Sequence, residues 1–340
     1  MEPTPFVYIQ KDKSVETVAL RSLSIMKFFT LIHICKEEQS IHNNSFAKSF
    51  DDQISLYLNC AKQFHRSLVP ASIELTILTN DKLFLHRLNT ENYPIEILQL
   101  NFLSKYPSGI RFYSAHYKLE VFQYLSSVDE EYTALVDSDM LCLNGMPESF
   151  KAIIDKKLPL YYDITSQVVP AYGAENIIKD KQLVSGKPSD ESWAGGEFIA
   201  GPPSFFATLT KEIKKVEANY FRHVAALHHQ GDEMLTSVAV EALKESGDFE
   251  IAEAGALSIV GRFWSYTPLH VQKPIAAHAA HFLLHLPSDK KFIATLSRDK
   301  LRGEAFFKKY SRHLTFSRTF NIIFKSIKPY AKRIRKKFAF

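Results

Sequence analysis

Two aspartates separated by a single serine interrupt an apolar stretch near the middle of the chain. Asp137 and Asp139 follow the apolar run 134–136, and apolar residues resume at Met140. A run of this composition is typical of a strand in a sheet that is covered on both faces. Residues at positions i and i+2 of an extended chain point to the same side, so the two carboxylates can meet at one point. Mg²⁺ and Mn²⁺ prefer such oxygen ligands and often bridge a carboxylate pair to substrate phosphates.

The same residues also fit a turn that only ends a strand, because Asp and Ser are common in turns. An isolated D-x-D more often has that plain explanation. In either case the fold must supply partners, because burying Asp137 and Asp139 unpaired would cost several kcal/mol each. The choice therefore depends on the other residues that reach the same place.

A second acidic pair, Asp232 and Glu233, follows Gly231 and the histidine pair 228–229. The glycine and the sequence after it predict a helix that begins at this point, where the helix dipole favours acidic residues. A structural role at a helix N-terminus is one explanation. The other is a catalytic or sugar-binding cluster.

Three histidines lie close together in the apolar stretch 274–286, which we predict to be one strand. They are His278, His281 and His285. A single histidine on an apolar strand is more often a core residue than a ligand, but each of three needs its own hydrogen-bond partner. One of them is therefore a candidate for a third metal ligand.

The elements that must position these residues alternate between strand and helix. The sequence predicts strands over 27–35, 73–79 and 95–100, a fourth strand ending at Asp137, and helices over 45–67 and 112–125. This alternation indicates an α/β domain. Ligands gather beyond the carboxyl ends of the strands in such sheets, so His33 is a candidate for contact with a nucleotide base, although a structural histidine fits equally well. Lys118 in the second helix is a candidate for a diphosphate, and a solvent-exposed lysine is the alternative.

The composition is that of a soluble globular protein. The chain has 340 residues, of which 46% are hydrophobic and 23% are charged. Its three cysteines are scattered without C-x-x-C spacing. This favours a reducing compartment, and we expect neither a disulfide framework nor a zinc cluster. The first thirty residues are too polar for a signal peptide, and no apolar run is long enough to span a membrane.

The C-terminal tail, residues 296–340, has a different character. Every charged residue from 308 to 340 is Lys or Arg, and aromatic and aliphatic residues alternate with them. This pattern predicts basic amphipathic helices, interrupted near Pro329, that bind an anionic membrane surface. Nucleic acid would attract the same charge, but no nucleic-acid module precedes the tail, so none is expected as a partner. A packed terminal helix with a solvated basic edge is the remaining alternative.

Taken together, these stretches resemble the GT-A glycosyltransferases over residues 27 to about 292. The stretches HYKLEVFQYL and YTALVDSDM resemble the helix and D-x-D block of that class, and AGGEFIAG resembles its acceptor-side strand. GDEMLT is similar to the acidic D-Q-D-x-L-N block of the retaining glycogenin-like and lipopolysaccharide galactosyltransferase-like enzymes. HLPSDKKF is similar to their H-x-x-G-x-x-K-P-W block.

The resemblance implies a fold, a domain division and a metal site. The fold is a single Rossmann-like α/β domain of the nucleotide-diphospho-sugar transferase type with a mixed central sheet, covering 27–295 between an approach segment, 1–26, and the tail. Asp137 and Asp139 would bind Mn²⁺ or Mg²⁺ together with His285, or with His281 as the second choice.

The remaining implied roles concern the substrates. Asp137, Lys118 and Lys291 would lie near the donor diphosphate. Glu233 or Asp232 would attack or stabilise the anomeric carbon. The predicted activity is metal-dependent transfer of a sugar from a nucleotide-sugar, a UDP-sugar, to a glycan or glycolipid acceptor such as lipopolysaccharide or capsule. Transfer would proceed with retention, on the cytoplasmic face of the membrane.

Two other functions remain open at this point. A sugar nucleotidyltransferase would need a glycine-rich phosphate loop after the first strand, and the corresponding segment, KEEQSIHNN, has no glycine. A non-catalytic protein that binds lipid or nucleic acid could use a degenerate transferase fold. Metal binding separates this last alternative from the enzymes.

Overall fold

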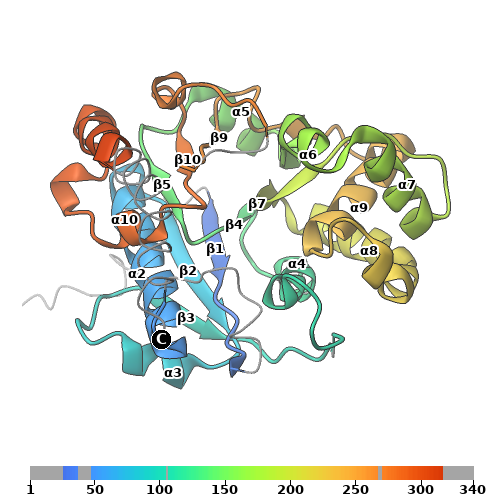
Figure 1. Ribbon diagram of the computed structural model, residues 1–340, viewed down its shortest axis with the longest axis horizontal. Coiled ribbons are helices and arrows are strands. Elements are labelled where there is room, and N and C mark those ends of the chain that lie inside the picture. Colours follow the sequence, from blue (N-terminus) through green and yellow to red (C-terminus); the bar gives the residue numbers. More distant parts are fainter. Residues whose placement is uncertain (1–25, 37–46, 105, 267–269, 317–340) are drawn as a thin grey trace, which may run out of the picture.

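The computed structural model describes residues 26–36, 47–104, 106–266 and 270–316. Within these residues a seven-stranded sheet of order β3-β2-β1-β4-β7-β6-β8 runs through the molecule (Figure 1). Its strands are β1 (Lys27–Leu31), β2 (Glu74–Thr79), β3 (Glu96–Gln99), β4 (Thr133–Val136), β6 (Leu160–Asp163), β7 (Ala194–Gly201) and β8 (Ala252–Glu253). Strands β3, β2, β1 and β4 are parallel, whereas β7 is antiparallel to both β4 and β6. The sheet is therefore mixed.

A smaller sheet begins where β4 ends. In the described part of the chain it has three strands, with β10 (Leu283–His285) between β5 (Met140–Cys142) and β9 (Val260–Arg262). β10 is antiparallel to β5 and parallel to β9, so His285 is in register with Met140 on one side and Arg262 on the other. The chain passes from the large sheet to the small one through Asp137–Asp139, which makes the D-x-D segment the junction of the two sheets.

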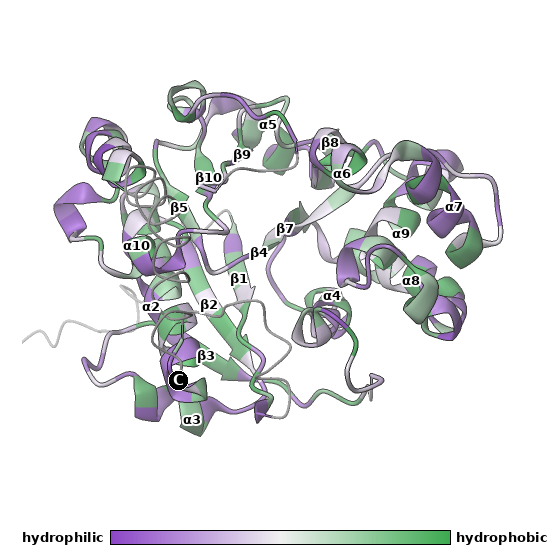
Figure 2. Cartoon of the chain, viewed as in Figure 1, coloured by the Kyte–Doolittle hydropathy of each residue, from purple (hydrophilic) through white to green (hydrophobic). Residues whose placement is uncertain are grey.

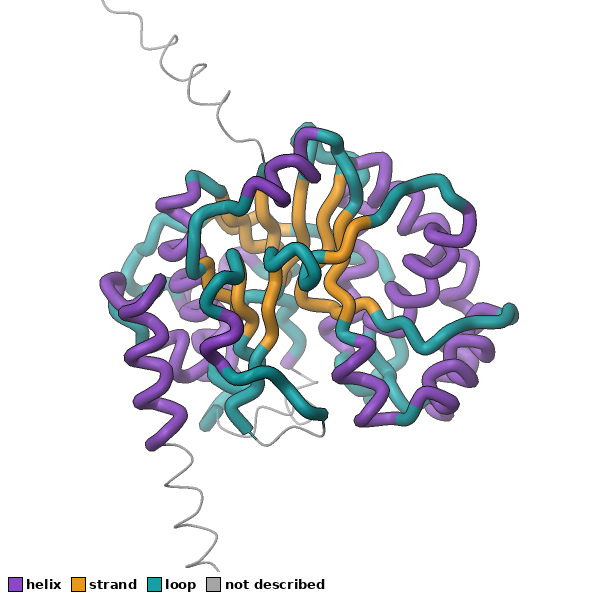
Figure 3. Tube along the Cα trace, turned by 90° about the horizontal axis from the view of Figure 1, so that it is seen from above, coloured by secondary structure: helices purple, strands orange, loops and turns teal. Residues whose placement is uncertain are grey.

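Helices lie on both sides of the strands, as Figure 3 shows from above. The α-helices are α2 (Phe50–Leu68), α3 (Lys82–Leu88), α4 (Lys118–Leu125), α5 (Glu148–Asp155), α6 (Thr165–Tyr172), α7 (Ala174–Ser185), α8 (Pro203–His223), α9 (Asp232–Ser246) and α10 (Lys290–Ala294). The 3₁₀ helices are η2 (Val69–Ala71), η3 (Tyr113–Tyr117), η4 (Val224–Ala226), η5 (Ile275–His278) and η6 (Arg298–Lys300). Residues 303–316 are also helical. α9 packs on β7 and α10 packs on α2, so both helices are fixed beside the junction of the two sheets.

The bounds of α2 follow from its local sequence. Ser49 caps the helix, because its Oγ accepts a hydrogen bond of 3.1 Å from the backbone N–H of Asp52. Asp51 and Asp52 occupy the first turn, and His65 and Arg66 occupy the last, which complements the helix dipole at both ends. The predicted start at residue 45 is therefore several residues early.

The apolar core has two parts. The larger part surrounds the seven-stranded sheet, and Figure 2 shows the apolar run of β2 in the middle of the molecule. The smaller part joins the three-stranded sheet to α10 and to the helical residues 303–316. Its members include Leu141, Leu284, Phe292, Phe306, Tyr310 and Leu314. The beginning of the predicted tail therefore packs on the domain, as the packed-helix alternative expected.

The predicted α/β domain with a mixed central sheet is confirmed, with the D-x-D segment at the end of β4 as the GT-A resemblance implies. The prediction of one strand over 274–286 is wrong. His278 ends the 3₁₀ helix η5, His281 follows that helix, and only His285 lies in a strand. Pro274 and the alanine-rich segment after it favour a helical turn over a strand, because alanine has a high helix propensity.

Parts of two other predictions lie outside the described residues. These parts are the approach segment up to residue 25 and the tail from residue 317, including the interruption near Pro329. Among the helices that the structure describes, none combines the length and the apolar character needed to cross a membrane.

Candidate active site

The D-x-D segment is a turn, and its two carboxylates nevertheless converge. The backbone N–H of Asp137 continues the β4–β7 ladder by donating to the carbonyl of Glu197 at 3.0 Å. The carbonyl of Asp139 accepts a hydrogen bond of 3.2 Å from the N–H of Leu286, just beyond β10. One aspartate is thus fixed to each sheet. Both local interpretations of the sequence, the turn and the convergent pair, describe the structure.

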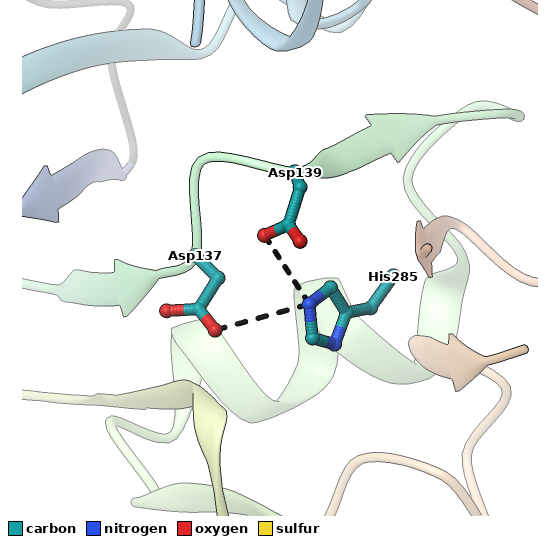
Figure 4. Close-up of side chains that lie close together, drawn as sticks. All are labelled: Asp137, Asp139 and His285. Carbon is teal, nitrogen blue, oxygen red and sulfur yellow. Dashed lines mark ion pairs between the residues drawn. The ribbon is translucent and has the colours of Figure 1, made fainter. Parts of the chain in front are cut away.

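His285 completes a cluster with these two aspartates. Figure 4 shows the Nε2 edge of its imidazole facing both carboxylates. Nε2 lies 3.8 Å from Oδ2 of Asp137 and 3.2 Å from Oδ1 of Asp139, and the candidate ligand atoms of all three residues lie within 4.8 Å of one another. Nε2 is buried and makes no hydrogen bond of good geometry, although Oδ1 of Asp139 is nearby. Two carboxylates and an unsatisfied imidazole nitrogen fit Mn²⁺ or Mg²⁺. His281 lies elsewhere, against Gly261 and the ring of His278.

Two lysines neutralise the aspartates. Nζ of Lys118, the first residue of α4, donates to Oδ1 of Asp137 and to the carbonyl of Gly196, both at 2.7 Å. Nζ of Lys290, the first residue of α10, lies 2.5 Å from Oδ2 of Asp139. The sequence nominated Lys118 but missed Lys290, and it named the neighbouring Lys291, which lines the same pocket.

The charges shift the titration of this cluster. Burial alone would raise the pKa of Asp139, but Lys290 and His285 hold that pKa well below its usual range. Burial alone would lower the pKa of His285, but the carboxylates of Asp139 and Glu197 raise it to about 9. Asp137 and Asp232 likewise raise the pKa of Lys118 despite its burial. Without a bound cation, His285 and both lysines are therefore positively charged at neutral pH.

The acidic pair Asp232 and Glu233 begins α9 and faces the same cluster. Glu233 is held by donors on both oxygens: the N–H of Gly196 at 3.1 Å and the indole Nε1 of Trp193 at 3.0 Å. Oδ2 of Asp232 is buried without a hydrogen bond and lies 3.8 Å from Nζ of Lys118. Burial raises the pKa of Asp232 to about 7, with Lys118 opposing and Glu233 adding to the rise.

Gly196 in β7 connects these groups. Its carbonyl accepts from Lys118 and its N–H donates to Glu233. A Cβ at this position would lie 3.1 Å from both Oδ2 of Asp232 and Cγ of Glu233. The glycine therefore permits a close approach of the acidic pair to the strand.

The nominated residues other than His278 and His281 line one pocket of about 860 Å³. At one end His33, beyond the carboxyl end of β1, stacks on Tyr117 with ring centroids 3.8 Å apart. The pocket also contains five charged residues that the sequence did not nominate: Arg111, Glu197, Arg262, Asp289 and Lys290. Glu197 carried a visible signal, since it is an acid inside the apolar strand AGGEFIAG. The proposed roles of the lining residues stay predictions.

The comparisons with known proteins give structural similarities only. No family model matches the chain, and neither does any curated protein. Similar solved structures include the bifunctional glycosyltransferase WbbM, with a TM-score of 0.46 and 10% identity over 77% of this chain and 46% of WbbM. An active-site mutant of LgtC has a TM-score of 0.46 and 10% identity over 77% of this chain and 88% of its own. The galactosyltransferase LgtC in complex with donor and acceptor sugar analogues also has a TM-score of 0.46 and 10% identity, over 80% of this chain and 97% of LgtC.

The chain thus spans less than half the length of WbbM, at 46%. Similarities at this TM-score carry no functional argument. The function has to be argued from the residues of the pocket.

Proposed function

We propose that this protein is a metal-dependent glycosyltransferase. It moves a sugar from a nucleotide-sugar, specifically a UDP-sugar, to a glycan acceptor and retains the configuration of the anomeric carbon. One observation carries the proposal. The Asp137–Asp139–His285 cluster and the acidic pair at the start of α9 line the same pocket, and Lys118 lies between them. A cation site beside fixed carboxylates suits transfer of a sugar from a nucleoside diphosphate, because the cation stabilises the leaving diphosphate and a carboxylate stabilises the anomeric carbon.

The diphosphate would lie against the cluster. A divalent cation held by Asp137, Asp139 and His285 would supply positive charge to the oxygens of the leaving diphosphate. Lys118, Lys290 and Lys291 would add charge to the same oxygens. The stacked pair His33 and Tyr117 supports a base-binding role for this end of the pocket.

The acidic pair would face the sugar. Glu233 is the first candidate for the group that stabilises or attacks the anomeric carbon, because two N–H donors fix its carboxylate. Asp232 ranks second, because its pKa of about 7 leaves it partly protonated at neutral pH, and a protonated carboxyl stabilises positive charge less well. The bond from the anomeric carbon to the diphosphate breaks with its electron pair staying on the phosphate oxygen. The acceptor hydroxyl forms the new bond on the same face and gives its proton to an oxygen of the departing diphosphate.

The acceptor and the location rest on the sequence. A lipopolysaccharide or capsule acceptor follows from the resemblance to the lipopolysaccharide galactosyltransferase-like enzymes. The basic tail would bring the protein to the anionic cytoplasmic face of a membrane, where such glycolipids are assembled.

A donor screen tests the proposal. A panel of nucleotide-sugars is incubated with Mn²⁺ or with EDTA, and release of the nucleoside diphosphate is measured. We expect one donor to be hydrolysed with Mn²⁺ only, and hydrolysis to fall by about 10²–10³ in Asp139→Asn and in Glu233→Gln. The exposed Asp129→Asn, outside the pocket, is the matched control. Hydrolysis that is equal in EDTA, or no hydrolysis of any donor, would contradict the proposal.

A further inference from the structure

Glu197 is a carboxylate that the mechanism above does not use. It lies within β7, is 1% exposed, and is followed by the buried residues Phe198 and Ile199. A buried carboxylate is costly unless charged partners compensate for its lost hydration. Its presence in an apolar strand beside the site therefore needs an explanation.

Its partners are a candidate metal ligand and an arginine. Oε1 of Glu197 lies 3.4 Å from Nδ1 of His285 and 3.2 Å from Nη1 of Arg262. Arg262 in turn lies over the ring of Trp264, 4.9 Å from its centroid. Glu197 is therefore fixed between the guanidinium of Arg262 and the imidazole of His285.

The strand pairing brings these residues together from three places in the chain. Glu197 enters from the large sheet, next to Asp137, whose N–H bonds the Glu197 carbonyl. His285 and Arg262 are neighbours in register on β10 and β9 of the small sheet. The carboxylate of Glu197 also occupies the space beside Gly195, where a Cβ would collide with it. The contact is thus built into the junction of the two sheets.

The contact with Glu197 affects which ring nitrogen of His285 carries the proton. A histidine that binds a metal has lost the proton on its ligating nitrogen, so it keeps one N–H and one lone pair, and it commonly donates that N–H to a carboxylate. Glu197 lies at Nδ1, whereas Asp137 and Asp139 lie at Nε2. Donation from Nδ1 to Glu197 leaves the Nε2 lone pair directed at the aspartates.

We propose that Glu197, held in place by Arg262, is a positioning residue that orients His285 for metal binding. It sets the tautomer and the ring angle of His285 and touches neither the metal nor the substrate. This inference rests on the proposed metal site. An ion pair that only neutralises buried charge would stabilise the fold without changing the affinity for a cation.

The test is the affinity of the metal-free protein for Mn²⁺, measured by isothermal titration. We expect Glu197→Ala to raise the Kd for Mn²⁺ about 10–100-fold. Glu197→Gln should fall between Glu197→Ala and the wild type, because its amide oxygen still accepts from Nδ1. The matched control is Glu241→Gln, which removes a different partly buried carboxylate, paired with Lys181 at 3.1 Å, and should leave the Kd unchanged.

A second readout separates positioning from structure. In the variants that fold, the Mn²⁺ concentration for half-maximal donor hydrolysis should rise in parallel with the Kd, while kcat at saturating Mn²⁺ returns towards the wild-type value. If Glu197→Ala does not fold, Glu197→Gln and Arg262→Lys decide, and both should weaken Mn²⁺ binding.

The outcomes distinguish the two proposals. Unchanged Mn²⁺ affinity in folded Glu197 variants would overturn the positioning role and leave the metal site intact. Absence of Mn²⁺ binding by the wild type would overturn the metal site, and with it this inference. Equal loss of affinity in Glu241→Gln would show that the effect is one of stability only.

Discussion

Two adjacent acids at the start of α9 have different environments. Glu233 receives hydrogen bonds from a backbone N–H and an indole N–H, which fix the position of its carboxylate. Asp232 has a buried oxygen without a donor, and burial raises its pKa. Pairs of carboxylates whose environments differ in this way commonly divide catalytic tasks.

The raised pKa of Asp232 predicts a pH-dependent stability. The folded pKa is about 7, and the unfolded value is about 3.9. Between these values the folded state binds more protons than the unfolded state, so this stability is present at low pH and is lost as the pH rises through about 7. Asp232→Asn removes this titration.

We expect the wild type to lose on the order of 2–3 kcal/mol between about pH 5 and about pH 8 through this group, a loss that Asp232→Asn lacks. Urea unfolding of both proteins at the two pH values measures it. A difference in unfolding free energy between wild type and variant that is the same at both pH values would show that Asp232 does not titrate in this range.

Among single residues, the sequence identified those whose chemistry is local. Asp137 and Asp139 stand out because two acids interrupt an apolar run, and the structure places both in the pocket with His285. Lys290 and Arg262 could not be found in this way. Surface lysines and arginines are common, and only the tertiary contacts of these two distinguish them.

At the scale of elements, the β4–β7 pairing decides where the acidic pair sits. β7 passes between Lys118 and Glu233, and Gly196 bonds to both. The contact depends on the absence of a side chain at this position, because a Cβ would lie 3.1 Å from atoms of both acids. Contacts this close require one of the two neighbours to move.

We therefore expect Gly196→Ala to lower kcat by about tenfold or more, since a small displacement of a catalytic group has large effects. Gly145→Ala is the matched control, because no atom lies within 4 Å of a Cβ there. Donor hydrolysis and thermal unfolding of both variants provide the measurement. Wild-type activity in Gly196→Ala would indicate that the acidic pair does not need its present position.

The elements were predictable where a local pattern sets them. The apolar runs of β1, β2 and β4 and the amphipathic α2 were recognised from periodicity, although the start of α2 was placed several residues too early. The segment 274–286 was not recognised, because it begins with a 3₁₀ helix, Ile275–His278, whose apolar residues resemble those of a strand. The small sheet was missed because its strands have only three residues each and because β5 pairs with β10, which is distant in the sequence.

For the whole molecule, the helical residues 303–316 link the tail to the active site. The hydroxyl of Tyr310 donates to Oδ2 of Asp289 at 2.7 Å, and Nε2 of His313 lies 3.1 Å from Oδ1 of the same residue. Asp289 immediately precedes α10, which carries Lys290 and Lys291. Residues 303–316 therefore support α10, which presents both lysines to the pocket.

This packing decides where the tail can be cut. Removal of residues after 305 takes away the buried Phe306, Tyr310 and Leu314, and loss of buried aromatic side chains alone costs about 3–5 kcal/mol each. We expect this truncation to destabilise the protein and abolish activity. Truncation after residue 316 should retain donor hydrolysis and lose binding to anionic vesicles, because it removes most of the basic residues of the tail.

Vesicle sedimentation and donor hydrolysis of both truncated proteins measure these effects. Neutral vesicles serve as the control for charge. Sedimentation with anionic vesicles that is unchanged after removal of residues 317–340 would contradict the membrane role of the tail.

If Asp137, Asp139 and His285 hold a cation against a nucleoside diphosphate, binding of that diphosphate must depend on the metal. The most direct measurement is calorimetric binding of a panel of nucleoside diphosphates, UDP among them, to the wild type in Mn²⁺ and in EDTA, and to Asp139→Asn in Mn²⁺. We expect one nucleoside diphosphate to bind the wild type in Mn²⁺, and its binding to be lost in EDTA and in Asp139→Asn but retained in Asp129→Asn. Two results would contradict this cation site: a nucleoside diphosphate that binds equally strongly in EDTA and in Mn²⁺, or no binding of any nucleoside diphosphate of the panel in Mn²⁺.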